Sequence, residues 1–383
     1  MKYRRFGKLD WEVSALGFGA MRLPLTDGDW ASIDEPEAIR MMRYAIDHGV
    51  NYLDTAYGYH SGRSEGFIGR VLKDGYRERV KLATKSPIWL VESAQDFDRY
   101  LNEQLERLQT EKIDFYLLHG LNGRTWRKVQ DLGVLRWAED KMTQGKFKHL
   151  GFSFHDNYET FKKIVDAYDN WTLAQIQYNY VDVDYQAGYR GLEYAAGKGL
   201  AVVIMEPLRG GQLAKEPPAS VARVWGTAPQ KRTPTAMAFL WVWNHPEVSV
   251  ALSGMSTMEQ VKENIATAEH SRANNLTSDE LSLIKRVREA YNELSPIPCT
   301  SCGYCTPCPN GVAIPTIFQM YNEAIVYGDL QKAQFLYHNP NILKEEQRAD
   351  QCLECDECLK ACPQEIPIPE WLKKAHELLK PKQ

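Results

Sequence analysis

The sequence predicts an α/β protein in which a closed (β/α)8 TIM barrel is followed by a small, mainly α-helical module. From about residue 14 to 268, eight short apolar or β-branched runs alternate with longer amphipathic stretches. Eight strand–helix alternations in a segment of this length fit a closed parallel barrel better than an open doubly wound sheet. All eight cysteines lie in residues 299–383, so residues 1–298 contain none. The two parts therefore carry different chemistry, and 383 residues are enough for two domains.

The expected strands follow one another along the barrel segment and are separated by amphipathic helical patterns. They are Ala15–Ala20, Asn51–Asp54, Val80–Thr84, Ile113–Leu118, His149–Phe152, Leu173–Gln177, Ala201–Met205 and Val248–Leu252. Helical patterns between them include Glu37–His48, Ala94–Leu108 and Leu132–Gln144. In the second part, Thr316–Tyr327 and Asp329–His338 also have helical patterns.

Two short pieces precede the first barrel strand. Tyr3–Phe6 and Trp11–Val13 flank Gly7-Lys-Leu-Asp10, so we expect a hairpin over the barrel floor. After the seventh strand, the connection Glu206–Lys231 is long and rich in Gly and Pro, and connections of this length are usually functional or disordered. Thr233-Pro234 then opens the next helix with proline in its first turn.

A short proline-containing linker separates the barrel from the cysteine-containing part. The last helix of the first part is expected at Ser278–Leu294, and Ser295-Pro-Ile-Pro298 is typical of a linker. We therefore expect a barrel domain at residues 1–295 and a second domain at residues 296–383.

The cysteines form two quartets, each closed by Cys-Pro. The first is Cys299, Cys302, Cys305 and Cys308, and the second is Cys352, Cys355, Cys358 and Cys362. The second quartet has the C-x2-C-x2-C-x3-C-P spacing that holds [4Fe–4S] clusters, and the first has one residue fewer before its last cysteine. A zinc site needs only two C-x2-C pairs, and a disulfide framework does not need this spacing. The pattern indicates two [4Fe–4S] clusters, with structural zinc as the weaker alternative.

The spacing also predicts how the two quartets share their ligands. In two-cluster proteins the fourth cysteine of such a run ligates the other cluster. We therefore expect Cys308 to join the second quartet's first three cysteines, and Cys362 to join those of the first quartet. The segment 309–351 is too long for a compact two-cluster ferredoxin, so a mainly helical ferredoxin-like module is expected.

Four polar residues follow the expected barrel strands, at the face where barrel chemistry is located. They are Asp54, Lys85, His119 and, five residues after Asp54, Tyr59. Taken singly, Asp54 is a helix cap, Lys85 a surface lysine and His119 a core histidine. Together they form one device, because a cation close to a phenol stabilises phenolate and lowers the tyrosine pKa from about 10. A tyrosine tuned in this way can donate a proton to a carbonyl that is being reduced.

These residues carry a resemblance to a known family. Asp54-Thr-Ala-Tyr-Gly-Tyr59, Lys85 after Ala83-Thr84, and Leu117-Leu-His119 are similar to the catalytic tetrad of the aldo-keto reductases at its usual spacings. The resemblance implies that Tyr59 is the general acid, that Lys85 and Asp54 tune it, and that His119 orients the carbonyl. The cysteine part resembles helical ferredoxin-type modules, and the whole chain resembles the iron–sulfur subgroup of that family.

The resemblance also implies a nicotinamide cofactor. Ser153 and Gln175 are expected to hold its carboxamide, Met205 and Leu208 to lie against it, and Glu263 with Asn264 to contact adenine. The neighbouring family asparagine is replaced by Phe154. No Rossmann fingerprint or Walker A motif is present in the sequence, as expected for a barrel binder.

The positions that clamp the 2′-phosphate of NADP in the family hold no cation in this chain. They are Gly254 and Gln260, so NAD(H) is slightly favoured over NADP(H). Arg209 and Lys231 are candidates for a substitute cation from a loop.

Several other residues near the predicted barrel mouth have two interpretations. The aromatic side chains Trp30, Tyr57, Trp89 and Trp126 either line a substrate pocket or pack around the rim. His155 and Asp156 either add polar contacts or cap the following helix, and capping by Asp156 is favoured.

The composition narrows the class of function. A net charge of −4 gives no reason to expect nucleic acid or a membrane surface as a partner, and oxygen-labile clusters without an export signal indicate the cytoplasm. The leading hypothesis is an enzyme, a nicotinamide-dependent oxidoreductase that reduces a small carbonyl substrate or oxidises the alcohol. Its clusters would transfer electrons to a partner protein, sense redox state or be structural. The alternatives are an electron-transfer protein with the barrel as a docking scaffold and a zinc-stapled reductase.

Overall fold

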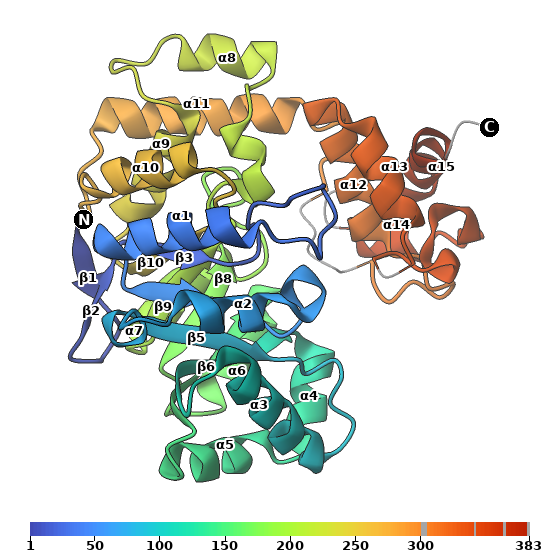
Figure 1. Cartoon of the computed structure of the whole chain (residues 1–383). Coiled ribbons are helices and arrows are strands. Elements are labelled where there is room, and N and C mark those ends of the chain that lie inside the picture. Colours follow the sequence, from blue (N-terminus) through green and yellow to red (C-terminus); the bar gives the residue numbers. More distant parts are fainter. Residues whose placement is uncertain (300–304, 341, 363–364, 381–383) are drawn as a thin grey trace. The chain divides into compact units, whose positions relative to one another are not determined.

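The computed structural model describes residues 1–299, 305–340, 342–362 and 365–380 (Figure 1). The chain divides into two compact units. The first comprises Met1–Val183, Ala187–Gly211 and Arg232–Leu276, and the second comprises Asp184–Gln186, Gln212–Lys231 and Thr277–Gln383. The helix expected at Ser278–Leu294 is α11 (Ser278–Glu293), and it belongs to the second unit. The domain boundary at residue 295 stays a prediction.

The first unit is the predicted closed barrel of eight parallel strands. The strands pair in the spatial order β10, β3, β4, β5, β6, β7, β8 and β9, and β9 pairs back to β10. Their bounds are β3 (Leu16–Gly19), β4 (Tyr52–Asp54), β5 (Lys81–Ser86), β6 (Ile113–Leu121), β7 (Phe147–Phe154), β8 (Leu173–Gln177), β9 (Ala201–Met205) and β10 (Val248–Ser253). Their side chains are almost entirely buried because helices cover the outside and side chains fill the inside.

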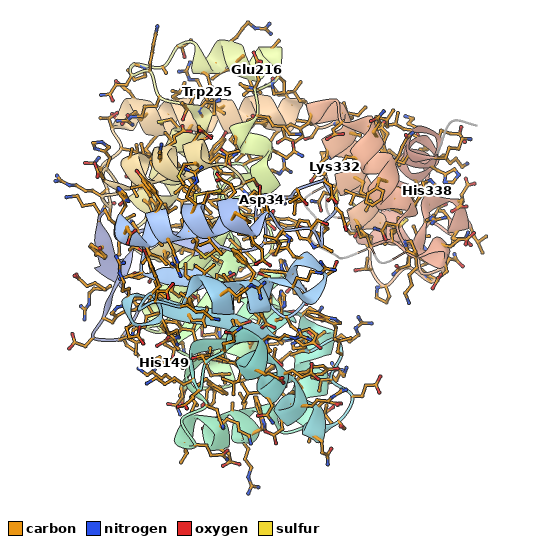
Figure 2. All side chains as sticks on the ribbon, viewed as in Figure 1. Asp34, His149, Glu216, Trp225, Lys332 and His338 are labelled. Carbon is orange, nitrogen blue, oxygen red and sulfur yellow. The ribbon has the colours of Figure 1, made fainter. Side chains whose placement is uncertain are left out.

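Helices follow the strands in the order that the sequence predicts. They are α1 (Glu35–Asp47), α2 (Ser64–Val71), α3 (Ala94–Leu108), α4 (Gly123–Asp131), α5 (Val134–Thr143), α6 (Tyr158–Asp166), α7 (Gly188–Gly197), α9 (Pro234–Asn244) and α10 (Met258–Ala268). Asp34, labelled in Figure 2, caps α1 by accepting the N–H of Glu37 at 3.2 Å. The helix expected at Leu132–Gln144 begins later because Gly133, with φ +76°, separates α4 from α5.

The expected hairpin is confirmed beneath the barrel strands. β1 (Tyr3–Arg5) and β2 (Glu12–Ser14) are antiparallel, and Phe6 between them is fully buried. The Phe6 ring centroid lies 4.7 Å from that of Phe115, near the start of β6. His149, labelled in Figure 2, stacks on the same Phe115 ring at 5.3 Å. An aromatic cluster therefore closes the end of the barrel opposite to the strand ends.

The second unit is mainly helical, as expected. It contains α8 (Ala219–Trp225), α11, α12 (Ile314–Tyr327), α13 (Leu330–His338), α14 (Glu357–Ala361) and α15 (Ile368–Leu379). Its core includes Ile317, Phe318 and Leu372. The connection Glu206–Lys231 contains a short 3-10 segment, η3 (Arg209–Ala214), as well as α8, so it is partly regular. Within the described residues, every helix is too short or too polar to span a lipid bilayer.

We expect Gly7→Ala to destabilise the barrel far more than Gly145→Ala. Both glycines have positive φ, +55° and +73°, so each alanine incurs about 1–2 kcal/mol of backbone strain. At Gly7 the added methyl would also lie 2.7 Å from the Gly199 carbonyl oxygen, whereas Gly145 has open space around it. Overpacking adds roughly 1–3 kcal/mol, which urea unfolding followed by tryptophan fluorescence measures. Equal losses of stability in the two variants would contradict this packing.

Candidate active site

A buried ion pair lies where two neighbouring strands end. Asp54 closes β4 and Lys85 lies on β5, and the pairing of Asp54 with Ala83 brings their side chains together. Lys85 Nζ is 2.6 Å from Asp54 Oδ1 and donates to the Thr55 carbonyl oxygen at 2.8 Å. Burial lowers the pKa of Lys85, but the Asp54 charge and Tyr59 raise it more, so the pKa lies above its ordinary value. Lys85 is therefore a buried cation.

Tyr59 completes this group from the loop after β4. It begins the 3-10 segment η1 (Tyr59–Gly62), and Lys85 Nζ donates to its hydroxyl oxygen at 3.3 Å. Burial raises the pKa of Tyr59 above its ordinary value, and Lys85 offsets only part of this rise. The expectation that Lys85 lowers this pKa below about 10 is therefore wrong, because the motif does not reveal the desolvation of the phenol. The phenol stays protonated at neutral pH, which is the form that donates a proton.

His119 lies beside Tyr59. Their ring centroids are 6.0 Å apart in an edge-on arrangement. Burial, together with Lys85 and His155, lowers the pKa of His119 well below its ordinary value, so the imidazole is neutral. Within the described part of the chain, its Nδ1 is buried and has no hydrogen-bond partner.

A strand irregularity positions His119. The strand was expected to end at Leu118, but β6 continues to Leu121, and its register with β7 shifts between these two residues. Gly120 has φ +65°, and its N–H donates to Ser153 Oγ at 2.8 Å. His119 is thus held inside a bulged strand by a hydroxyl from the neighbouring strand.

A buried polar network bonds to Thr84 and to the backbone of Lys85 on β5. This network was not predicted from the sequence. Glu65 Oε1 accepts from Thr84 Oγ1 at 2.6 Å and from Gln104 Nε2 at 2.5 Å. The same Gln104 nitrogen donates to the Lys85 carbonyl oxygen at 3.1 Å. One feature of the sequence could have revealed the network: Gln104 is a polar residue on the apolar face of the helix expected at Ala94–Leu108. The network fixes the backbone that carries Lys85.

The residues expected to hold a nicotinamide include buried polar atoms that lack partners within the described chain. Gln175 Nε2 donates to Asp54 Oδ2 at 3.4 Å, while its Oε1 has no partner. Asn264 Nδ2 donates to Ser253 Oγ at 3.1 Å, while its Oδ1 also has none. These acceptors suit the N–H groups of a carboxamide and of adenine, so the residues fit a nicotinamide dinucleotide.

The other expected cofactor residues make ordinary contacts. Ser153 accepts from Gly120, and Glu263 Oε1 accepts from Thr233 Oγ1 at 2.7 Å. Met205 is half-buried at the end of β9, and half-buried Leu208 accepts the Gly211 N–H at 3.0 Å.

The positions that lack the family cations have other contacts. Gln260 Oε1 accepts the Ser256 N–H at 2.8 Å, and Gly254 faces the side chain of Arg22. Of the two proposed substitutes, Arg209 forms an ion pair with Asp182 at 3.1 Å. The other, Lys231, belongs to the second unit.

The four aromatic residues near the mouth have different environments. Trp89 is 49% exposed and its ring lies 5.1 Å from His119, beside the candidate site. Trp126 is buried against Trp171, and Trp30 stacks on His60.

The remaining polar residues near the mouth make structural contacts. The Tyr57 hydroxyl donates to Glu103 at 2.8 Å. The expectation that Asp156 caps the following helix is wrong. Asp156 accepts the Gly123 N–H of α4 at 2.9 Å, and Asn157 caps α6.

Most of the described cysteines lie against the core of the second unit. Six of them pack against it: Cys299, Cys305, Cys308, Cys352, Cys358 and Cys362. Cys355 is exposed, and Cys302 lies outside the described residues. Burial raises the pKa of Cys358, and nearby Cys352, Cys308 and Cys355 raise it further. The electrostatic effect of Cys308 on Cys358 agrees with the predicted cross-ligation.

The thiolate donor set fits iron–sulfur clusters, because such clusters are held by cysteine thiolates. Among the residues that the structure describes, no three Cys, His or carboxylate side chains gather as they would around a single metal ion. The assignment of each cysteine to a cluster stays a prediction.

We expect Asp54→Asn to lower the free energy of unfolding by about 3–5 kcal/mol, because it leaves the Lys85 cation buried without its carboxylate. Adding Lys85→Met should recover most of this loss, since removing both charges is close to neutral. The control Asp47→Asn breaks the half-exposed pair with Arg79 and should cost about 0–1 kcal/mol. Urea unfolding measures all three, and no recovery in the double variant would contradict the pairing.

Comparisons with known proteins agree with this geometry. A model of the aldo/keto reductase family matches residues 15–289, and a model of the 4Fe-4S dicluster domain matches residues 298–366. An uncharacterized oxidoreductase of Bacillus subtilis is 27% identical over 341 residues, covering 78% of this chain and 97% of the relative. L-galactose dehydrogenase of Arabidopsis thaliana is 25% identical over 313 residues, covering 77% and 97%.

A solved structure is similar to the barrel. The aldo-keto reductase of Bacillus halodurans in its holo form has a TM-score of 0.62 and 28% identity, covering 75% of this chain and 96% of that one. The family match spans most of the chain, and the eight-stranded barrel with its Asp–Tyr–Lys–His group is present. The chain is therefore an oxidoreductase that belongs to the aldo/keto reductase family and ends in an iron–sulfur domain.

Proposed function

We propose that the chain is a nicotinamide-dependent oxidoreductase that reduces a small aldehyde or ketone, or oxidises the corresponding alcohol. The observation that carries this proposal is the position of Lys85 Nζ, 2.6 Å from Asp54 and 3.3 Å from the Tyr59 hydroxyl. A docking scaffold has no use for a buried charge pair, which costs several kcal/mol per ion to desolvate.

Each member of the tetrad has a distinct role in this reaction. A nicotinamide, when bound, would supply the hydride for this reduction. Tyr59 would donate its hydroxyl proton to the substrate carbonyl oxygen. Lys85 stabilises the phenolate that remains, and Asp54 holds Lys85 charged and oriented. Neutral His119, beside Tyr59, orients the substrate oxygen.

The cofactor would lie along residues from β7, β8, the end of β9 and helix α10. Ser153 and Gln175 hold the carboxamide, Met205 and Leu208 lie against the dinucleotide, and Glu263 and Asn264 contact adenine. Because Gly254 and Gln260 carry no charge, NAD(H) binds at least as tightly as NADP(H). In the alcohol direction the same residues act in reverse, with Tyr59 accepting the proton.

The second domain would hold two [4Fe–4S] clusters. One uses Cys299, Cys302, Cys305 and Cys362, and the other uses Cys352, Cys355, Cys358 and Cys308. The electrostatic effect of Cys308 on Cys358 supports this partition. The clusters serve electron transfer to a partner protein, redox sensing or structure. Thiolates of this kind belong to a reducing compartment, so we place the protein in the cytoplasm.

We expect Tyr59→Phe to reduce carbonyl turnover by about 10²–10⁴-fold while leaving cofactor binding unchanged, because only the proton donor is lost. Steady-state turnover and a separate titration of the cofactor measure the two properties. Tyr76→Phe, which alters a hydroxyl bonded to Asp47 on an exposed surface, is the matched control and should retain activity. Near-normal turnover of Tyr59→Phe would rule out this assignment.

We expect anaerobic protein to contain about eight iron and eight sulfide per chain. If Cys308 and Cys352 share a cluster, the double Cys308→Ser/Cys352→Ser variant should keep about four iron, because it disables one cluster only. The matched Cys308→Ser/Cys299→Ser variant should disable both clusters and lose nearly all iron. Iron and sulfide analysis with EPR of the reduced protein distinguishes them. Zinc in place of iron, or the reverse pattern of loss, would overturn the assignment.

A further inference from the structure

Arg22 lies between two segments that carry expected cofactor residues. It follows β3 in the chain, and its carbonyl oxygen accepts from Ser256 Oγ at 2.9 Å. Its side chain passes over Gly254, and its Nη2 atom lies beside Gly210. Gly210 is close in sequence to Leu208, and Gly254 precedes the helix that bears Glu263 and Asn264. One arginine thus extends from the β10 loop to the β9 loop.

Glycine at position 254 makes room for this arginine. The Gly254 backbone is outside the left-handed region, so conformational freedom does not explain the residue. A Cβ atom there would lie 3.0 Å from Arg22 Cβ and 3.2 Å from Arg22 Cγ, closer than ordinary contacts. Gly254, which stands where the family has a cation, is therefore the residue over which the Arg22 side chain lies.

The charge of Arg22 is available for a ligand. Its side chain is exposed, and among the described residues no carboxylate lies within 4.0 Å of its guanidinium. Arg209, on the neighbouring turn, is instead committed to Asp182 at 3.1 Å. Gly210, next to the Arg22 guanidinium, has φ +64°, and the following Gly211 has φ +93° with no atom within 4 Å of its Cβ position. A backbone without side chains allows a ligand to approach closely.

We propose that Arg22 binds a phosphate group of the nicotinamide dinucleotide, and so places a cation next to Gly254, which carries none of its own. This inference rests on the proposed function, because it requires a dinucleotide in the barrel. Guanidinium is well suited to the task, since its fixed fork of N–H donors matches phosphate oxygens. The phosphate is either the pyrophosphate, which NADH and NADPH share, or the 2′-phosphate of NADPH.

The test is a titration of NADH and NADPH into anaerobic full-length protein at low and high salt, followed by tryptophan fluorescence and calorimetry. Arg22→Gln should weaken binding about ten- to a hundredfold, the range of a lost charge-assisted hydrogen bond. It should also reduce the dependence of affinity on salt. The control Arg136→Gln removes an exposed arginine from α5 and should bind as the unaltered protein does. Arg22→Lys keeps the charge and should recover part of the affinity.

The titrations answer two questions: which phosphate Arg22 binds, and whether Arg22 binds the cofactor at all. An equal loss for NADH and NADPH assigns Arg22 to the pyrophosphate. A loss confined to NADPH assigns it to the 2′-phosphate and reverses the proposed NAD(H) preference. Binding of both cofactors by a folded Arg22→Gln variant with unchanged affinity overturns the role of Arg22 alone. Failure of the unaltered protein to bind either cofactor overturns the proposed function instead.

Discussion

The buried ion pair between Lys85 and Asp54 constrains the rest of the barrel site. Two charges removed from water are stable only when good geometry and further hydrogen bonds compensate for their lost hydration. Here the ammonium also bonds the Thr55 carbonyl, and the second carboxylate oxygen accepts from Gln175. Strands β4, β5 and β8 supply these partners, so a shift in register of any one of them would leave a charge unpaired. The same strand register therefore closes the barrel and positions the reactive residues.

The sequence allowed the order and type of the barrel elements to be predicted, because their hydrophobic patterns are local. The bounds of β8, β9 and α3 agree with those expected. Features that depend on non-local contacts were missed. The bulge at Gly120 depends on Ser153 from another strand, and the network of Glu65 and Gln104 joins residues distant in the chain. The raised pKa of Tyr59 was also missed, because a sequence motif does not reveal how deeply a phenol is buried.

The two parts of the chain differ in the kind of electron transfer that they can support. A hydride carries two electrons, whereas a four-iron cluster passes one, and the sequence contains no recognisable flavin motif to connect them. Six of the described cysteines pack on the core of the helical unit, so assembly of clusters and folding of that unit are coupled. Loss of a cluster would thus change the packing of α12 and α15 as well as the colour of the protein.

The contact between Arg22 and Gly254 also limits how this chain could evolve or be redesigned. A lysine introduced at position 254 alone would collide with the arginine stem before it could add its own charge. The two positions are therefore epistatic. A larger side chain at position 254 requires a smaller residue at position 22 first. A family alignment that treats each column independently would score the single change as a return to the common residue, although in this background it would be harmful.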